Sequence, residues 1–158
     1  MSNIEGLDSL FKKLENLNVD INRTLEKSVT KSMKETVQAE AKLLCPVDIG
    51  DLRESIEVKT EVGDNSITGI VYTNSDHAAY VEFGTGKVGE DTPVTDKYPG
   101  PLSYKQDKWL VNIPDVGPRY IAGQPAQPFL YPALKNNKDK IIAGIKDDLK
   151  AAIKGVVK

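Results

Sequence analysis

The residues best suited to chemistry lie close together in one segment. His77 is the only histidine of the chain; it follows Asp76 and precedes Glu82 by a few positions. A histidine beside carboxylates is typical of an acid–base pair or of a metal site. One histidine without a second ligand at metal-binding spacing is weak support for either role. An ordinary loop histidine therefore stays open beside the catalytic interpretation.

Cys45 and the segment Gly84-Thr85-Gly86 are two further candidates for reactivity. Cys45 is the only cysteine, which excludes an intrachain disulfide and a cysteine-based metal site. It follows two leucines at an expected helix end, so we interpret it as a buried apolar side chain rather than a reactive thiol. Gly84-Thr85-Gly86 resembles half of a phosphate loop but lacks the Gly-Lys-Ser/Thr that should follow. We therefore expect no cofactor and no metal ion.

The overall charge limits the classes of partner. The 158 residues contain 21 Lys and Arg against 23 Asp and Glu, which gives a net charge of −2. Proteins whose main role is to bind nucleic acid usually carry a basic face, so this balance argues against that class. Trp109, Tyr104 and Tyr120 could stack on bases, but packing and loop anchoring explain them more simply.

The N-terminus and the hydropathy indicate a protein that is made and folded in a cytosol. The first residues, MSNIEGLDSL, contain neither the basic nor the apolar region of a signal peptide. No apolar run approaches the ~20 residues that span a bilayer. The length is enough for one domain with its own core, so we expect a single domain over residues 1–158.

Helical patterns occupy both ends of the chain. Apolar spacing predicts N-terminal helices within residues 1–45, one over 4–17 and a longer one from Ile21 to Leu44, interrupted near Asp20. Pro46 should end the second helix, because the residue before a proline is pushed out of the α region. A further amphipathic stripe predicts a C-terminal helix over 132–157, with Pro132 in its first turn.

The middle of the chain, residues 46–113, carries the strand patterns. Alternating apolar residues predict strands over 56–62 and 67–72, joined by a turn into a β-hairpin, and a third strand over 109–113. The Pro- and Gly-rich segments 84–107 and 114–128 should be loops. This order predicts an α+β fold, in which a small antiparallel sheet of three to four strands packs against a long N-terminal helix and a C-terminal helix.

The stretch from Pro46 to Ile56, PVDIGDLRESI, must join the helical part to the first strand. Gly50 can adopt backbone angles that other residues avoid. Asp48 can accept backbone N–H bonds or cap a short helical turn. Leu52 and Ile56 should then enter the core. We expect a structural corner here rather than a ligand-binding loop.

Three segments together resemble one known family. Residues 46–56 resemble its signature P-x-D-T-G-x-L-R-x-S-I, residues 79–85 (AYVEFGT) its Y-V-E-F-G-T, and residues 125–134 (PAQPFLYPAL) its P-A-Q-P-F-L-x-P-A-L. The family comprises the gene-product-ten-like tail-component proteins (neck, head–tail connector or tail-completion proteins) of long-tailed double-stranded DNA phages and prophages. The resemblance runs from about residue 20 to the C-terminus and departs at Ile49, where the family has threonine.

The resemblance implies a structural virion protein of the neck or tail-completion region, without cofactor or turnover. Copies would assemble as a ring in the virion at the head–tail junction, join the tail to the capsid and let double-stranded DNA pass through the lumen. Isolated subunits of such proteins can be monomeric. Other partners would be adjacent connector, head-closure or tail-terminator proteins, and assembly would take place in the host cytoplasm. The alternative, from the residues alone, is a small cytosolic enzyme or nucleic-acid-binding module that uses the His77 region.

The resemblance also singles out residues for structural or interface roles. We expect Arg53 to pair with Glu82, within one subunit or across a boundary, because guanidinium suits bidentate contact with a carboxylate. Two independently solvated charges are the alternative. Phe129 should anchor a proline-stiffened segment, either in the core or in a groove of a neighbour. The full set of candidates is Asp48, Gly50, Leu52, Arg53, Tyr80, Glu82, Phe83, Pro128, Phe129 and Pro132.

Overall fold

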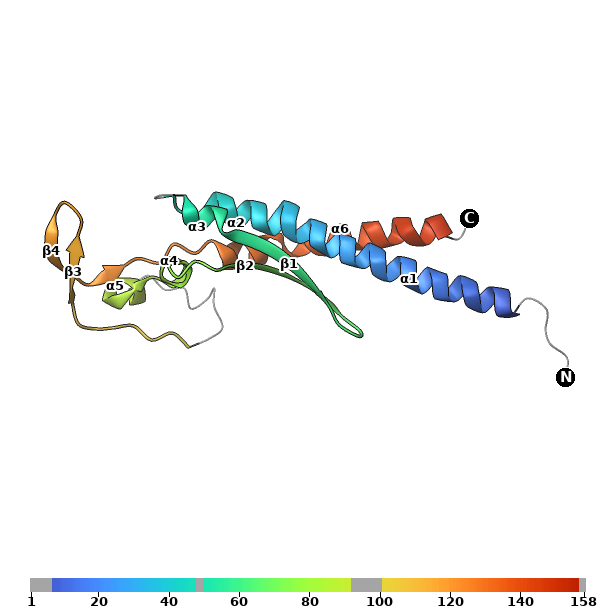
Figure 1. Ribbon diagram of the computed structural model, residues 1–158, viewed down its shortest axis with the longest axis horizontal. Coiled ribbons are helices and arrows are strands. Elements are labelled where there is room, and N and C mark those ends of the chain that lie inside the picture. The colour runs from blue at the N-terminus through green and yellow to red at the C-terminus, as the bar shows by residue number, and fades with distance from the viewer. Residues whose placement is uncertain (1–6, 48–49, 92–100, 157–158) are drawn as a thin grey trace.

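The computed structural model describes residues 7–47, 50–91 and 101–156. The molecule is elongated, and two long antiparallel helices place residues 7 and 156 on the same side (Figure 1). A first β-hairpin runs along these helices, and a second hairpin lies at the opposite end of the molecule. The α+β class and the two long terminal helices are as the sequence predicts.

The N-terminal helical arm runs without a break from residue 7 to residue 44. It consists of α1 (Leu7–Ser32), the π-helical segment η1 (Met33–Gln38) and α2 (Ala39–Leu44). The predicted interruption near Asp20 is wrong, because α1 continues through it. Asn and Asp are only modestly unfavourable inside a helix, whereas a proline or glycine would cost more.

The π-helical segment has a cause in the sequence. The buried apolar residues of this arm recur every four positions, at Val29, Met33, Val37 and Ala41, and Cys45 continues the spacing just after it. An α-helix has about 3.6 residues per turn, so a strict spacing of four drifts around its surface. A π-helix closes its hydrogen bonds one residue later and holds more residues in each turn. The wider turns of η1 therefore compensate for the difference between a spacing of four and 3.6 residues per turn. They keep the apolar stripe facing the core.

The first hairpin packs on this stripe. Strands β1 (Ile56–Val62) and β2 (Ile67–Thr73) pair antiparallel, with Ile56 opposite Thr73 and Val62 opposite Ile67. Ile56 is fully buried, and Val71 packs against the core from β2. The helix approaches β2 most closely at Gly69, where an added Cβ would lie 2.8 Å from Val29 Cγ1 and collide with the Met33 side chain.

Replacing Gly69 with alanine should lower the free energy of unfolding by about 1 to 3 kcal/mol, because the new methyl forces β2 away from η1. Gly144 in the last helix is the matched control, since a Cβ there would meet nothing within 4 Å. Alanine at 144 should stabilise by up to about 1 kcal/mol through helix propensity. Urea unfolding of both variants checks the pair, and equal effects at the two positions would contradict this packing.

The segments expected to be loops contain regular structure. Helices α4 (Ala78–Phe83) and α5 (Gly86–Glu90) follow β2, so part of the predicted loop 84–107 is helical. Beyond β3 (Trp109–Ile113), residues 114–128 hold β4 (Gly117–Ile121) and the short β5 (Gly123–Gln124). The four paired strands therefore form two separate two-stranded antiparallel sheets, β1–β2 and β3–β4, instead of one small sheet.

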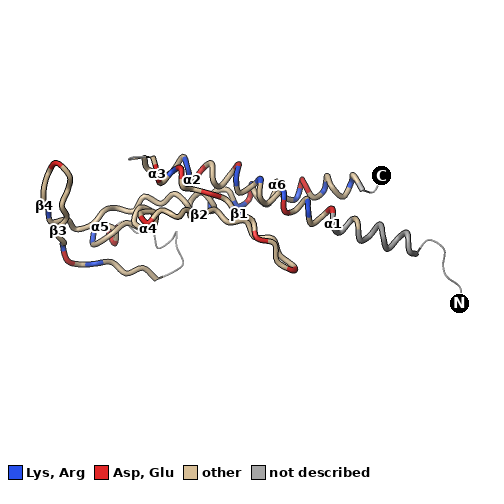
Figure 2. Tube along the Cα trace, in the orientation of Figure 1, with Lys and Arg blue, Asp and Glu red and all other residues tan. Residues whose placement is uncertain are grey.

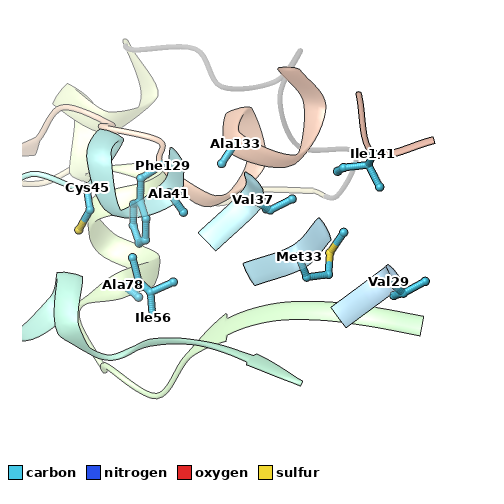
Figure 3. Packing of buried hydrophobic residues seen from close by; sticks show 10 residues of the cluster. All are labelled: Val29, Met33, Val37, Ala41, Cys45, Ile56, Ala78, Phe129, Ala133 and Ile141. Carbon is cyan, nitrogen blue, oxygen red and sulfur yellow. The ribbon is translucent and has the colours of Figure 1, made fainter. Parts of the chain in front are cut away.

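The last helix, α6 (Leu130–Val156), begins two positions before the predicted start and lies against α1. The buried Ser28 hydroxyl donates to Asp148 Oδ2 at 2.6 Å, and Asn137 Nδ2 donates to the Glu40 carboxylate. The core lies where α1, η1, α2, β1, α4 and α6 meet (Figure 3). Its ten buried apolar residues are Val29, Met33, Val37, Ala41, Cys45, Ile56, Ala78, Phe129, Ala133 and Ile141.

Candidate assembly interface

The corner motif turns the chain as its glycine predicts. Gly50 adopts φ +96° immediately before the short helix α3 (Asp51–Glu54), a conformation that L side chains rarely take. Leu52 packs against the core and Ile56 is fully buried. Asp48 lies outside the described residues. Gly50 and α3 therefore turn the chain between the helical arm and β1.

Arg53 of this corner acts at the C-terminal end of the first helical arm. Its Nη2 donates to the Cys45 carbonyl at 3.2 Å, and Cys45 is the residue that follows α2. The last carbonyls of a helix lack partners within it and carry partial negative charge, so a guanidinium is favourable there. Arg53 Nε is buried without a hydrogen-bond partner among the described residues.

Glu82 acts at the N-terminal end of α6. It is buried on α4, and its Oε2 accepts the N–H groups of Phe129 at 2.7 Å and Leu130 at 2.9 Å. Its Oε1 accepts the Tyr131 N–H at 3.0 Å. A helix leaves its first four N–H positions without internal partners. Glu82 satisfies three of them, and the fourth, Pro132, has no N–H to satisfy.

The two motif charges are thus bonded to helix ends and not to each other. Among the described residues Arg53 and Glu82 form no ion pair, so the expected pairing within one subunit is wrong. A carboxylate at a helix N-terminus and a guanidinium at a helix C-terminus each complement the helix dipole. The Glu82 contacts also tie the second family motif, in α4, to the third, at the start of α6.

Cys45 lies between these two charges and is almost wholly buried. Burial raises the pKa of its thiol, Arg53 lowers it by a smaller amount, and Glu82 raises it. The raised pKa keeps the thiol protonated, and its Sγ donates to the Pro46 carbonyl at 3.6 Å. This is the environment of a structural cysteine, as the sequence predicts.

Alkaline pH should destabilise the protein through Cys45. Because the pKa of this thiol is higher in the folded than in the unfolded chain, its stabilising contribution is present below about pH 8.5 and lost above it. The free energy of unfolding, measured in urea at several pH values, should therefore fall more steeply above about pH 8.5 than that of a Cys45→Ala variant. Parallel pH profiles for the two proteins would contradict this.

The structure does not bring the candidate chemical residues together. Asp76 and His77 are exposed, whereas the Glu82 carboxylate is buried and accepts hydrogen bonds from the backbone at the start of α6. His77 instead lines a shallow hollow with Ser75 and Asp51, and no hydrogen bond joins these three side chains in the described part of the chain. No group of three His, Cys, Asp or Glu residues that could hold a metal ion occurs among the described residues.

An apolar groove of about 530 Å³ lies between β2 and the start of α6. Met33 and Val37 of η1 line it, together with Tyr72 of β2 and Leu134 of α6. Phe83, one of the expected interface residues, also lines it, and the Phe83 carbonyl accepts the Tyr104 hydroxyl at 2.9 Å. The full lining is Met33, Val37, Gly69, Val71, Tyr72, Thr73, Ser75, Ala78, Ala79, Glu82, Phe83, Leu130, Tyr131 and Leu134.

The remaining expected interface residues divide between surface and interior. Tyr80 is exposed, and its carbonyl accepts Gln124 Nε2 at 2.9 Å. Pro128 and Pro132 are half-buried around the start of α6. Phe129 is fully buried in the core of its own chain, which settles the choice between core and neighbour in favour of the core.

A second apolar surface lies on the β3–β4 hairpin. Leu110, Val116 and Tyr120 are exposed there, and we call these three residues the hairpin patch. The sequence did not predict this patch or the role of Tyr131 and Leu134 in the groove. Leu134 fits the apolar stripe of α6, and only its exposure in the folded chain distinguishes it from a core residue.

The comparison with protein families fits this arrangement. Residues 8–84 match the family described as "Bacteriophage HK97-gp10, putative tail-component". This match places residues 8–84 in the HK97-gp10-like family. No curated protein and no solved structure matches the chain.

The HK97-gp10-like region spans α1 to α4 and contains both the corner motif and Glu82. It starts earlier than the expected resemblance and ends before the third motif at 125–134, which Glu82 nevertheless contacts. The family supports a structural role as a phage tail component and a virion-associated protein. None of the described helices has the length and apolar character needed to cross a membrane.

Proposed function

We propose that the chain is a structural subunit of the neck or tail-completion region of a long-tailed phage virion. Several copies form a ring at the head–tail junction and join the tail to the capsid. The observation that carries this proposal is the match of residues 8–84 to a phage tail-component family. Partners are further copies of the chain and the adjacent connector, head-closure or tail-terminator proteins, and assembly takes place in the host cytoplasm.

Two features of the structure support an assembly role. An apolar groove and an apolar hairpin patch are both left uncovered by the chain itself. Exposed apolar surfaces on a protein often mark sites of protein–protein interaction. Lysines, arginines and carboxylates intermingle along α6 and the described part of α1 (Figure 2), and the net charge is −2. This charge pattern suits a ring through which DNA passes without being held.

Interruption of the gene in the phage or prophage that carries it tests the proposal. We expect lysates of an amber mutant to contain DNA-filled heads and separate tails by electron microscopy. The wild-type chain supplied from a plasmid should restore joined particles and be found in them by mass spectrometry. A His77→Ala chain should restore them equally well. Normally joined particles in the mutant, or particles without the chain, would refute the proposal.

A further inference from the structure

We propose that the β3–β4 hairpin of one copy docks in the β2–α6 groove of a second copy. The inference rests on the proposed function and names the surfaces through which copies of the chain meet. The occupant of the groove is the hairpin patch of another copy of the same chain.

The β3–β4 hairpin presents apolar side chains that its own chain leaves uncovered. It lies at one end of the molecule, beyond α5 and apart from α1 and α6 (Figure 1). Tyr120 is 72% exposed, Leu110 57% and Val116 53%. A two-stranded hairpin with uncovered faces is only marginally stable in water. A surface that packs on it would therefore both bury the patch and hold the hairpin in place.

The β2–α6 groove offers a matching apolar lining. Its walls are mostly apolar or aromatic, and Leu134 on its α6 side is 48% exposed. The only charged side chain in the lining is Glu82, whose carboxylate already accepts three N–H groups. An apolar occupant therefore suits the groove. The exposed hairpin side chains Leu110, Val116 and Tyr120 are the apolar groups that would enter it.

Charge selects another copy of the chain as the occupant. The Lys135 ammonium lies 5.9 Å from the ring centroid of Tyr131 at the α6 wall of the groove. Asp115 is exposed at the tip of the hairpin, next to Val116. Neither side chain has an ion-pair partner among the described residues. A hairpin that enters with Val116 beside Leu134 brings the Asp115 carboxylate to the Lys135 ammonium, which is favourable.

This contact joins two different surfaces, so it is heterologous and leaves a free groove at one end of a dimer and a free hairpin at the other. Repetition of such a contact generates a closed ring if the rotation closes. Docking is through side chains, since Pro118 lacks the N–H that β4 would need to add fully to the edge of a neighbouring sheet.

Sedimentation velocity on the full-length chain up to about 1 mM tests the proposal. We expect the wild type to self-associate. The double variant Leu110→Ser/Tyr120→Ser and the single variant Leu134→Arg should each weaken self-association by at least about tenfold. Val62→Ser, at a position that is 62% exposed and outside both surfaces, is the control and should associate as the wild type does. Circular dichroism checks that each variant is folded.

Mixing the hairpin variant with the groove variant distinguishes a heterologous hairpin–groove interface from a symmetric one. The hairpin variant keeps its groove and the groove variant keeps its hairpin, so an equimolar mixture should form heterodimers and nothing larger. A symmetric interface would not be restored by mixing. Likewise Lys135→Glu and Asp115→Lys should each weaken association, and the two changes together in one chain should restore it.

Two results would overturn the docking proposal. The first is a wild-type chain that stays monomeric at every concentration. The second is self-association that survives the hairpin and groove substitutions, which would mean that copies meet through another surface. Neither result bears on the virion role, which the amber mutant and the composition of the particles decide separately.

Discussion

Replacement of Glu82 with alanine is expected to lower the free energy of unfolding by about 3 kcal/mol or more, the largest effect of any charged residue in the described chain. The substitution removes a buried acceptor and leaves the N–H groups of Phe129, Leu130 and Tyr131 without partners at the start of α6. It also removes a negative charge from the positive end of a 27-residue helix. Both losses act where α6 enters the core.

An isosteric substitution separates charge from shape. Glu82→Gln keeps one carbonyl acceptor but turns an amide NH₂ toward backbone N–H donors, so we expect a loss of about 2 kcal/mol. Glu35→Ala is the matched control, because Glu35 is exposed on η1 and should change stability by less than about 0.5 kcal/mol. Urea unfolding followed by circular dichroism measures all three. A Glu82→Ala midpoint equal to that of Glu35→Ala would show that the cap contributes nothing.

The parts of the fold that follow from local patterns were predictable. Apolar residues at helical spacing gave the N-terminal arm and α6, and strict alternation gave β1 and β2. Gly50 predicted the turn after the helical arm, because few residues other than glycine adopt a positive φ. Apolar spacing, alternation and glycine positions each involve only a few neighbouring residues. Local interactions between such neighbours largely determine the backbone conformation of these segments.

Structure that depends on distant partners was not predictable in this way. Strand β4 contains Gly117 and Pro118, shows no alternation, and exists because β3 pairs with it. Helix α5 contains two glycines, and Gly89 packs so closely on Gly84 that a Cβ on Gly84 would lie 2.8 Å from Gly89 Cα. In both segments tertiary contacts outweigh a weak intrinsic preference.

The Glu82 cap shows where a usable signal was available. The positions before α6 are Gln127, Pro128 and Phe129, none of which is a good N-cap residue. A helix of this length without a local cap requires an acceptor from elsewhere in the chain, and Glu82, in an otherwise apolar segment, can supply one. Both the acceptor, Glu82, and the uncapped start of α6 are visible in the sequence. Because they are 47 residues apart, the sequence alone did not show that they bond to each other. The groove and the hairpin patch had no such signal, because exposure is decided only by the folded chain.

Replacement of Phe129 with alanine is the second large expected effect, at about 3 to 5 kcal/mol. Phe129 is fully buried and lies beside Ala41 and Cys45 in the core (Figure 3). Its removal leaves a cavity where α2 and α6 meet, and the neighbouring side chains are too small to fill it. Phe129→Leu should cost less, because it removes only part of the ring volume. Leu134→Ala, one turn into α6, should cost under about 1 kcal/mol, since Leu134 is 48% exposed.

The Phe129 and Glu82 substitutions should not be additive. The Phe129 N–H donates to Glu82, so anchor and cap hold the same turn of α6, and loss of either loosens the other. A double-mutant cycle of Phe129→Leu with Glu82→Gln, measured by urea unfolding, should give a coupling energy of about 0.5 to 3 kcal/mol. The milder substitutions keep the double variant folded enough to measure. Strict additivity would mean that cap and anchor act on α6 independently, and that the link between the second and third motifs is geometric only.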